Sequence, residues 1–197
     1  MTGPLAPPSR VAFLGTPQIA VPLLQAVVDT GVAVPLVVSR ADARRGRRAH
    51  ATPSPVKAAA IELGLPVTDD LDAVVDADVD LAIVVAYGRI IPASLLARVP
   101  MVNVHFSLLP RWRGAAPVER AILAGDEVTG VCLREVAEAL DAGAGYSSAQ
   151  VRITPTTPAA ALRDEMVESS IPLLRAALAD GFPEPQPQVG EPVYADK

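Results

Sequence analysis

The sequence is poor in cysteine and in aromatic side chains. It has one cysteine, Cys132, and only 4% of its 197 residues are Phe, Trp or Tyr. A lone thiol cannot form an internal disulfide and has no companion at metal-ligand spacing, so we expect a buried, unreactive Cys132 and no metal site. The first ten residues lack the features of a secretory signal, and the apolar run 81–87 is too short to span a bilayer. These absences predict a cytoplasmic protein without membrane contact.

The abundant residues are aliphatic, and their pattern predicts the fold class. Half of the residues are apolar, so the core must be built from Val, Leu, Ile and Ala, which is typical of buried parallel strands. Strands are expected at 11–15, 32–38, 65–67, 81–85, 101–106, 128–136 and 145–153. Helices are expected from Thr16 as N-cap to about 29, at 55–63, at 115–123, and at 158–178 with a kink or break at Pro172. This alternation predicts an α/β fold, a mostly parallel sheet with helices on both faces.

The C-terminal composition suggests a boundary. Three prolines lie between 183 and 187, a pattern typical of an extended linker. We therefore expect a single α/β domain at 1–181, followed by a Pro-rich linker or tail at 182–197.

Charge is distributed unevenly along the chain. The net charge of −5 argues against non-specific nucleic-acid binding by the chain as a whole. Within 40–48, however, five arginines are opposed only by Asp42. This block is either a solvated loop or a handle for a polyanion, because guanidinium groups pair bidentately with phosphate.

Polar residues interrupt one of the predicted central strands. Asn103 and His105 are two positions apart, so their side chains point to the same face, where burial is costly unless the groups are used. Asp141 follows in a loop that could fold back over this strand. No nucleophilic Ser or Cys accompanies them, and the trio suits direct acyl transfer through a tetrahedral intermediate. On spacing alone, a structural histidine remains the alternative.

The residues around this trio resemble a known family. The string Asn103-Val-His-Phe-Ser-Leu-Leu-Pro110, with the later Asp141-Ala-Gly143, is similar to the signature of the folate-dependent formyltransferases. The segments 13–17, 53–57, 84–88 and 111–118 resemble the branch of the family that formylates methionyl-tRNA. The resemblance runs in order from residue 11 to about 180 and implies a Rossmann-like sheet.

The resemblance also implies roles for individual residues. It makes Asn103, His105 and Asp141 the catalytic set, with 10-formyltetrahydrofolate as formyl donor and initiator methionyl-tRNA as acceptor, in a monomer without metal. It places the folate pocket at Ala86, Tyr87, Gly88, Arg89, Ile90, Val136, Leu140 and Gly143. It assigns tRNA contacts to Arg40, Arg44, Arg45, Arg47, Arg48, Arg111 and Arg113.

The sequence departs from the family pattern in two places, and each departure leads to an expectation about binding. Alanines stand at 137, 139 and 142, where the family usually has an acid, a glycine and a threonine, so fewer side chains can hydrogen-bond there. Ala139 would be strained if its position needs a positive φ. The family's C-terminal β-barrel domain is not matched within the sequence, and without it we expect weak tRNA binding with a shallow salt dependence.

Two alternatives remain open at this point. The acceptor could be a smaller amine, such as an amino-sugar nucleotide, glycinamide ribonucleotide or a carrier-bound amino acid. The chain could also be a degenerate folate- or RNA-binding module without turnover.

Overall fold

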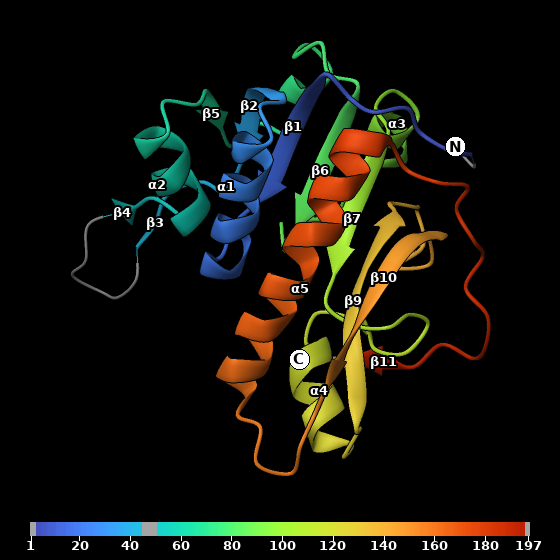
Figure 1. Ribbon diagram of the computed structural model, residues 1–197. Helices are drawn as coiled ribbons and strands as arrows, with labels where there is room; N and C mark the ends of the chain where they lie inside the picture. Colours follow the sequence, from blue (N-terminus) through green and yellow to red (C-terminus); the bar gives the residue numbers. More distant parts are fainter. Residues whose placement is uncertain (1–2, 45–50, 196–197) are drawn as a thin grey trace.

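The computed structural model describes residues 3–44 and 51–195 and is built around one seven-stranded sheet (Figure 1). The strand order is β10-β9-β7-β6-β1-β2-β5. The parallel strands are β1 (Arg10–Gly15), β2 (Ala33–Val38), β5 (Val67–Thr68), β6 (Leu81–Val85) and β7 (Met101–His105). Two antiparallel strands, β9 (Val128–Glu135) and β10 (Gly145–Arg152), extend the sheet beyond β7.

Strand β1 shows how the sequence buries both faces of this sheet. Val11 and Phe13 join one hydrophobic cluster, whereas Ala12 and Leu14 join another, because successive side chains of a strand alternate between faces. The first cluster includes side chains of α1 (Val21–Asp29), α2 (Pro55–Glu62), α4 (Pro117–Leu123) and α5 (Ala159–Asp180); the second includes side chains of η2 (Asp72–Val74) and α3 (Ala93–Leu96). Figure 1 accordingly shows α1 and α5 on one side of the strands and α3 on the other. The predicted α/β class, with helices on both faces, is confirmed.

Helix α5 has no break at Pro172, which was one of the two expected effects of this proline. The helix continues through it from Ala159 to Asp180. Leu162 and Met166 before the proline, and Leu174 after it, are all fully buried in the core. Packing against α1, β9 and β10 therefore outweighs the backbone hydrogen bond that the proline cannot donate.

The first helix also begins differently from the prediction. Thr16 is not its N-cap, because a short 3-10 turn, η1 (Gln18–Ala20), precedes α1. The Thr16 hydroxyl instead donates to the Tyr87 carbonyl at 2.8 Å, which ties the end of β1 to the turn after β6. Helix α2 does start as expected, since Ser54 Oγ accepts from the backbone N–H of Lys57 at 3.1 Å. The short pair β3 (Ala43–Arg44) and β4 (Ala51–Thr52) lies in the part of the chain between 38 and 55 for which no strand or helix was expected.

The segment after α5 runs extended along the domain. Phe182 is buried, and its backbone exchanges two hydrogen bonds with Leu5. Gln186 bridges to Gly145, and β11 (Tyr194–Ala195) pairs with β8 (Arg113–Gly114). Residues 182–195 therefore contact the N-terminal arm, β10 and the segment that follows β7.

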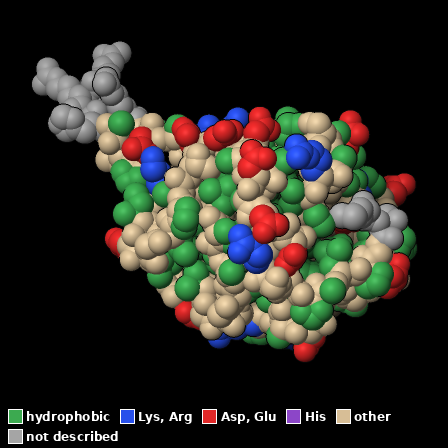
Figure 2. All heavy atoms as spheres, turned by 90° about the horizontal axis from the view of Figure 1, so that it is seen from above, with side chains coloured by type: hydrophobic (Ala, Val, Ile, Leu, Met, Phe, Trp, Pro, Cys, Tyr) green, Lys and Arg blue, Asp and Glu red, His purple; other side chains and the backbone are tan. Residues whose placement is uncertain are grey.

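The end of the molecule at which the parallel strands begin carries mainly acidic charge. Figure 2 views this end and shows red side chains gathered along one border of the face, with fewer blue ones. Asp76, Asp78 and Asp80 directly precede β6 at this end. Among the described residues, no helix combines the length and apolarity needed to cross a membrane.

Gly130 in β9 provides a test of the packing between the two antiparallel strands. A Cβ at this position would lie 2.1 Å from the Ala149 carbonyl oxygen and 2.7 Å from Leu108 Cδ2. Gly130→Ala should lower the free energy of unfolding in urea by about 2 kcal/mol or more, because the strands must separate. Gly145→Ala in β10 is the matched control, since its Cβ meets no atom within 4 Å, and it should change stability by less than about 0.5 kcal/mol. Equal stability of the two variants would contradict this packing.

Candidate active site

His105 ends β7 and lies buried beneath the segment that follows the strand. Its Nε2 is 3.0 Å from the Trp112 carbonyl oxygen. A carbonyl can only accept a hydrogen bond, so Nε2 carries the hydrogen and Nδ1 presents its lone pair. Burial lowers the pKa of His105 below its ordinary value; the Asp141 carboxylate opposes this shift and the Arg134 guanidinium adds to it. The lowered pKa favours the neutral imidazole, whose Nδ1 can accept a proton.

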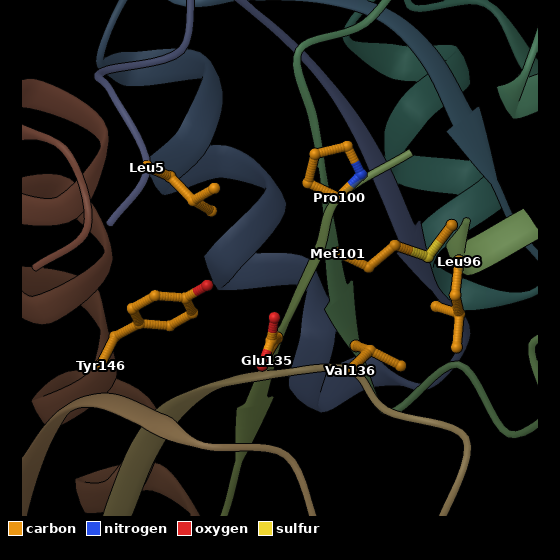
Figure 3. Close-up of a pocket in the computed structure, with 7 residues that line it drawn as sticks. All are labelled: Leu5, Leu96, Pro100, Met101, Glu135, Val136 and Tyr146. Atoms are coloured by element: carbon orange, nitrogen blue, oxygen red, sulfur yellow. The ribbon is translucent and has the colours of Figure 1, made fainter. Parts of the chain in front are cut away.

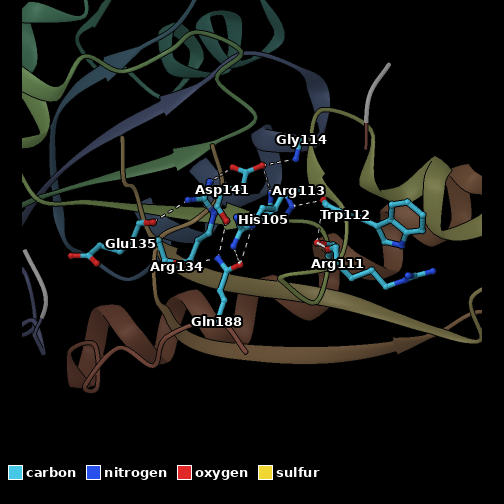
Figure 4. A network of polar contacts seen from close by, with 11 residues as sticks. His105, Arg111, Trp112, Arg113, Gly114, Arg134, Glu135, Asp141 and Gln188 are labelled. Atoms are coloured by element: carbon cyan, nitrogen blue, oxygen red, sulfur yellow. Dashed lines mark hydrogen bonds and ion pairs between the residues drawn. The ribbon is translucent and has the colours of Figure 1, made fainter. Parts of the chain in front are cut away.

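Asp141 reaches this histidine from the loop 136–144. Its Oδ2 lies 3.7 Å from His105 Nδ1 and accepts a hydrogen bond of 2.7 Å from the backbone N–H of Gly114 (Figure 4). Its Oδ1 forms an ion pair with Arg134. The loop thus folds back over β7, as the sequence analysis allowed, and sets a carboxylate beside the imidazole.

Arg134 is a member of this site that the sequence analysis did not identify. It lies on β9, directly opposite Asn103, and its side chain is only 5% exposed. Nη1 donates to the Glu135 carbonyl at 3.0 Å, while Nε is buried without a partner among the described residues. A buried guanidinium needs a counter-charge, which Asp141 supplies. The available signal was an arginine at the end of the run 128–134, in which four of the other six residues are Val, Cys or Leu.

Asn103 lies two residues before His105 on the same face of β7. It is partly exposed, and within residues 3–44 and 51–195 its amide has no hydrogen-bond partner. Its two N–H donors are therefore available to a ligand at the carboxyl end of the sheet. The structure thus brings the three predicted catalytic residues to one region, with Arg134 as a fourth polar group.

Cys132 pairs with His105 across β7 and β9 but is chemically silent. Burial raises the pKa of its thiol to about 11, so it stays protonated at neutral pH and does not act as a nucleophile. Its burial confirms the expectation of a buried small side chain. In the part of the chain that the structure describes, no three His, Cys, Asp or Glu side chains cluster as a metal site would require.

The residues predicted for folate lie in two segments. Ala86, Tyr87, Gly88, Arg89 and Ile90 form the turn after β6, in which the backbone φ is +46° at Ala86 and +79° at Gly88. Val136, Leu140 and Gly143 belong to the loop that carries Asp141. Val136 and Ile91 both pack against the hydrophobic cluster that contains Tyr87, but Val136 lies beside Met101 at the start of β7, whereas the turn 86–90 follows the end of β6. The side chains of Ile90 and Leu140 are 92% and 61% exposed, respectively.

The loop that carries Asp141 depends on the glycine of the Asp-Ala-Gly motif. A Cβ at Gly143 would lie 1.9 Å from the Glu135 carbonyl oxygen, so no other residue fits there without moving β9. The strain expected at Ala139 is not found, because the positive φ of this loop falls on Asp141, at 49°. A left-handed backbone is tolerated better by Asp than by most residues.

Of the arginines predicted to contact tRNA, those that the structure describes lie in two separate places. Arg40 is exposed just beyond β2, and Arg44 is part of β3, whereas Arg45, Arg47 and Arg48 lie outside the described residues. Arg111 pairs with Asp126 at 2.6 Å and stacks over Trp112 at 4.4 Å from the ring centroid. Arg113 donates to Gln188 Oε1 at 3.1 and 2.6 Å. In the sheet order, β1 and β6 separate the strand before Arg40 from the strand before Arg111 and Arg113.

A small cavity lies near the start of β7, at the end of the strand remote from His105 (Figure 3). Its volume of about 20 Å³ leaves room for little more than a water molecule. Burial raises the pKa of the Tyr146 phenol in its wall to about 12. The lining residues are Leu5, Leu96, Pro100, Met101, Glu135, Val136 and Tyr146. A cavity of this size cannot hold a substrate.

Comparison with known proteins places this arrangement in a family context. The chain is 48% identical over 197 aligned positions to the methionyl-tRNA formyltransferase of Cutibacterium acnes, covering 93% of this chain and 62% of the relative. It therefore spans less than two thirds of that curated relative. Among solved structures, it resembles phosphoribosylglycinamide formyltransferase from Bacillus halodurans (TM-score 0.72, 22% identity, 86% of this chain and 93% of that one). It also resembles an N-formyltransferase from Helicobacter canadensis in complex with folinic acid and dTDP-3-aminofucose (TM-score 0.70, 16% identity, 91% and 67%).

The structural neighbours share the fold, whereas a family model gives the membership. The model described as formyl transferase matches residues 9–178, which is well over half of the chain and includes the strands and loops that carry Asn103, His105 and Asp141. The chain therefore belongs to the formyl transferase family.

Proposed function

We propose that this chain transfers a formyl group from 10-formyltetrahydrofolate to the amino group of initiator methionyl-tRNA. One arrangement of side chains supports the proposal. The Asp141 carboxylate lies 3.7 Å from Nδ1 of a neutral His105, and the Asn103 amide, on the same face of β7, has no hydrogen-bond partner among the described residues. The name of the Cutibacterium acnes relative supports the choice of acceptor. Formyl transfer needs these three kinds of group and no metal or covalent nucleophile.

The proposed reaction is a direct attack of the amine on the formyl carbon. As the new C–N bond forms, the carbonyl oxygen becomes an oxyanion to which Asn103 donates. His105 Nδ1 takes the proton that the attacking nitrogen loses, and Asp141 stabilises the resulting imidazolium. The oxyanion then re-forms the carbonyl as the bond from the formyl carbon to the folate nitrogen breaks, and His105 returns its proton from Nδ1 to the leaving nitrogen.

The proposed folate site lies between the turn 86–90 and the loop 136–143. The turn offers backbone groups held in left-handed conformations, and the exposed side chains of Ile90 and Leu140 supply apolar surface beside them. The Helicobacter canadensis enzyme with the same fold was crystallised with folinic acid, which supports a reduced folate as the donor. Positions 137, 139 and 142 are alanines, so backbone groups rather than side chains would hold the pterin.

The proposed tRNA contacts rest on the arginines at 40–48 and on Arg111 and Arg113. Arg40 is exposed, and half of the Arg111 side chain remains open to solvent despite its pairing with Asp126. Guanidinium groups at these positions would pair with phosphates of the tRNA backbone. A smaller amine is the second candidate acceptor, favoured by the observation that Arg113 is already engaged by Gln188.

Incubation with 10-formyltetrahydrofolate and alternative amines separates the two acceptors. We expect methionyl-tRNA to be formylated with a kcat/KM at least about tenfold above that of glycinamide ribonucleotide or an amino-sugar nucleotide, because only a long phosphate backbone can contact the arginines beyond β2 and those after β7 together. Preference for a small amine would establish the second candidate. No transfer to any amine, with folate binding intact, would leave a binding module.

Removal of either polar side chain of β7 tests the catalytic assignment. His105→Ala and Asn103→Ala should each lower kcat by about two to four powers of ten, because the first removes the proton acceptor and the second removes an oxyanion donor. The rates are measured with saturating methionyl-tRNA, and circular dichroism checks the fold. Near-wild-type turnover by either variant would exclude that residue from the mechanism.

The ion pair of Asp141 and Arg134 allows stability and activity to be separated. Asp141→Asn removes the charge that balances a buried guanidinium and should cost about 3 kcal/mol of stability in urea as well as activity. Adding Arg134→Met should recover most of the stability, because no charge then remains buried, while activity stays low. A double variant as active as the wild type would show that the carboxylate plays no part in turnover.

A further inference from the structure

The C-terminal segment contacts both parts of the chain that hold the candidate catalytic residues. The backbone N–H of Arg113 donates to the Val193 carbonyl at 2.8 Å, and the Ala115 and Ala116 N–H groups donate to the Ala195 carbonyl at 3.1 and 3.2 Å. The segment pinned in this way presents the Trp112 carbonyl to His105 and the Gly114 N–H to Asp141. The tail, residues 182–195, therefore holds the backbone segment whose Trp112 carbonyl and Gly114 N–H contact His105 and Asp141.

One side chain of the tail, Gln188, joins the two parts. Its Nε2 donates to the carbonyl oxygens of Asp141 and Gly143, both at 2.8 Å. Its Oε1 accepts from Nε and Nη2 of Arg113 at 3.1 and 2.6 Å. Figure 4 shows Gln188 reaching toward the loop and Arg113 from the side opposite Gly114. Both ends of the amide are thus used, and Arg113 fixes which end faces the loop.

The loop that carries Asp141 needs such a support. Asp141 has a positive φ, which costs free energy unless its surroundings hold it. Ala137, Ala139 and Ala142 have no side-chain polar group with which to anchor the loop. Gln188 binds the loop at the carbonyl of Asp141 itself and again two residues later.

We propose that Gln188 is a positioning residue of the catalytic centre and that it acts by holding the backbone of Asp141 so that its carboxylate faces His105. This inference rests on the proposed formyl transfer. The segment 182–195 then takes part in positioning the catalytic groups.

Gln188→Met tests this role, because methionine has a similar length but cannot make the four hydrogen bonds. Val189→Ala is the matched control, since this neighbouring side chain is 87% exposed. We expect Gln188→Met to lower kcat by about tenfold to a hundredfold through misplacement of Asp141, and Val189→Ala to change it less than about twofold. Gln188→Glu keeps the acceptor for Arg113 but loses the donors to the loop, so it should be impaired like Gln188→Met.

A double-mutant cycle distinguishes positioning from general destabilisation. If Gln188 acts through Asp141, Gln188→Met should lower single-turnover rates little further in an Asp141→Asn background. The full tenfold or greater loss in that background, or a Gln188→Met enzyme within twofold of the wild type, would overturn the inference.

Hydrogen exchange keeps the inference testable apart from the proposed function. Amides of residues 140–144 should exchange faster in Gln188→Met than in the wild type or in Val189→Ala. Unchanged exchange would overturn the positioning role even if the wild type formylates methionyl-tRNA. If Gln188→Met exchanges faster than the wild type but the wild type has no transferase activity, only the proposed formyl transfer is overturned.

Discussion

The rest of the site depends on how the buried carboxylate of Asp141 is paired and hydrogen-bonded. Removing a charge from water costs several kcal/mol, and this cost is offset only if the carboxylate is paired and hydrogen-bonded. The structure supplies Arg134, the Gly114 N–H and the nearby imidazole of His105 for that purpose. Each partner comes from a different segment, so keeping the carboxylate buried also keeps β7, β9 and the segment around Gly114 in one arrangement.

The change from parallel to antiparallel strands makes this arrangement possible. Because β9 runs against β7, it carries Arg134 back to a position opposite Asn103, and the chain then leaves β9 near the start of β7. The loop 136–144 can therefore return over the strand face and bring Asp141 to His105. A further parallel strand at this place would have ended at the edge where β7 itself ends, so its loop would have begun beside His105 and would not have crossed the strand face.

Local patterns in the sequence predicted most of the strands and helices. They could not predict which residues, distant in the sequence, form hydrogen bonds in the candidate site. Apolar runs marked β1, β6 and β9, and the polar pair Asn103 and His105 stood out because it interrupts such a run. Gln188 gave no comparable signal, since it lies in a Pro-rich segment 47 residues from Asp141 and bonds to backbone carbonyls that every residue has. The Trp112 carbonyl and Gly114 N–H are invisible for the same reason. Pro172 did not break helix α5, because tertiary packing outweighed its local preference.

The charges of the site also determine what kind of base His105 is. Arg134 already neutralises Asp141, so the carboxylate stabilises an imidazolium less than an unpaired one would, and burial disfavours the protonated ring further. A proton that arrives at Nδ1 is therefore held weakly. In the proposed reaction, such a base would remove a proton from the tetrahedral intermediate and return it to the leaving nitrogen, which a more basic imidazole would do slowly. The guanidinium of Arg134 would thus favour the return of the proton from His105.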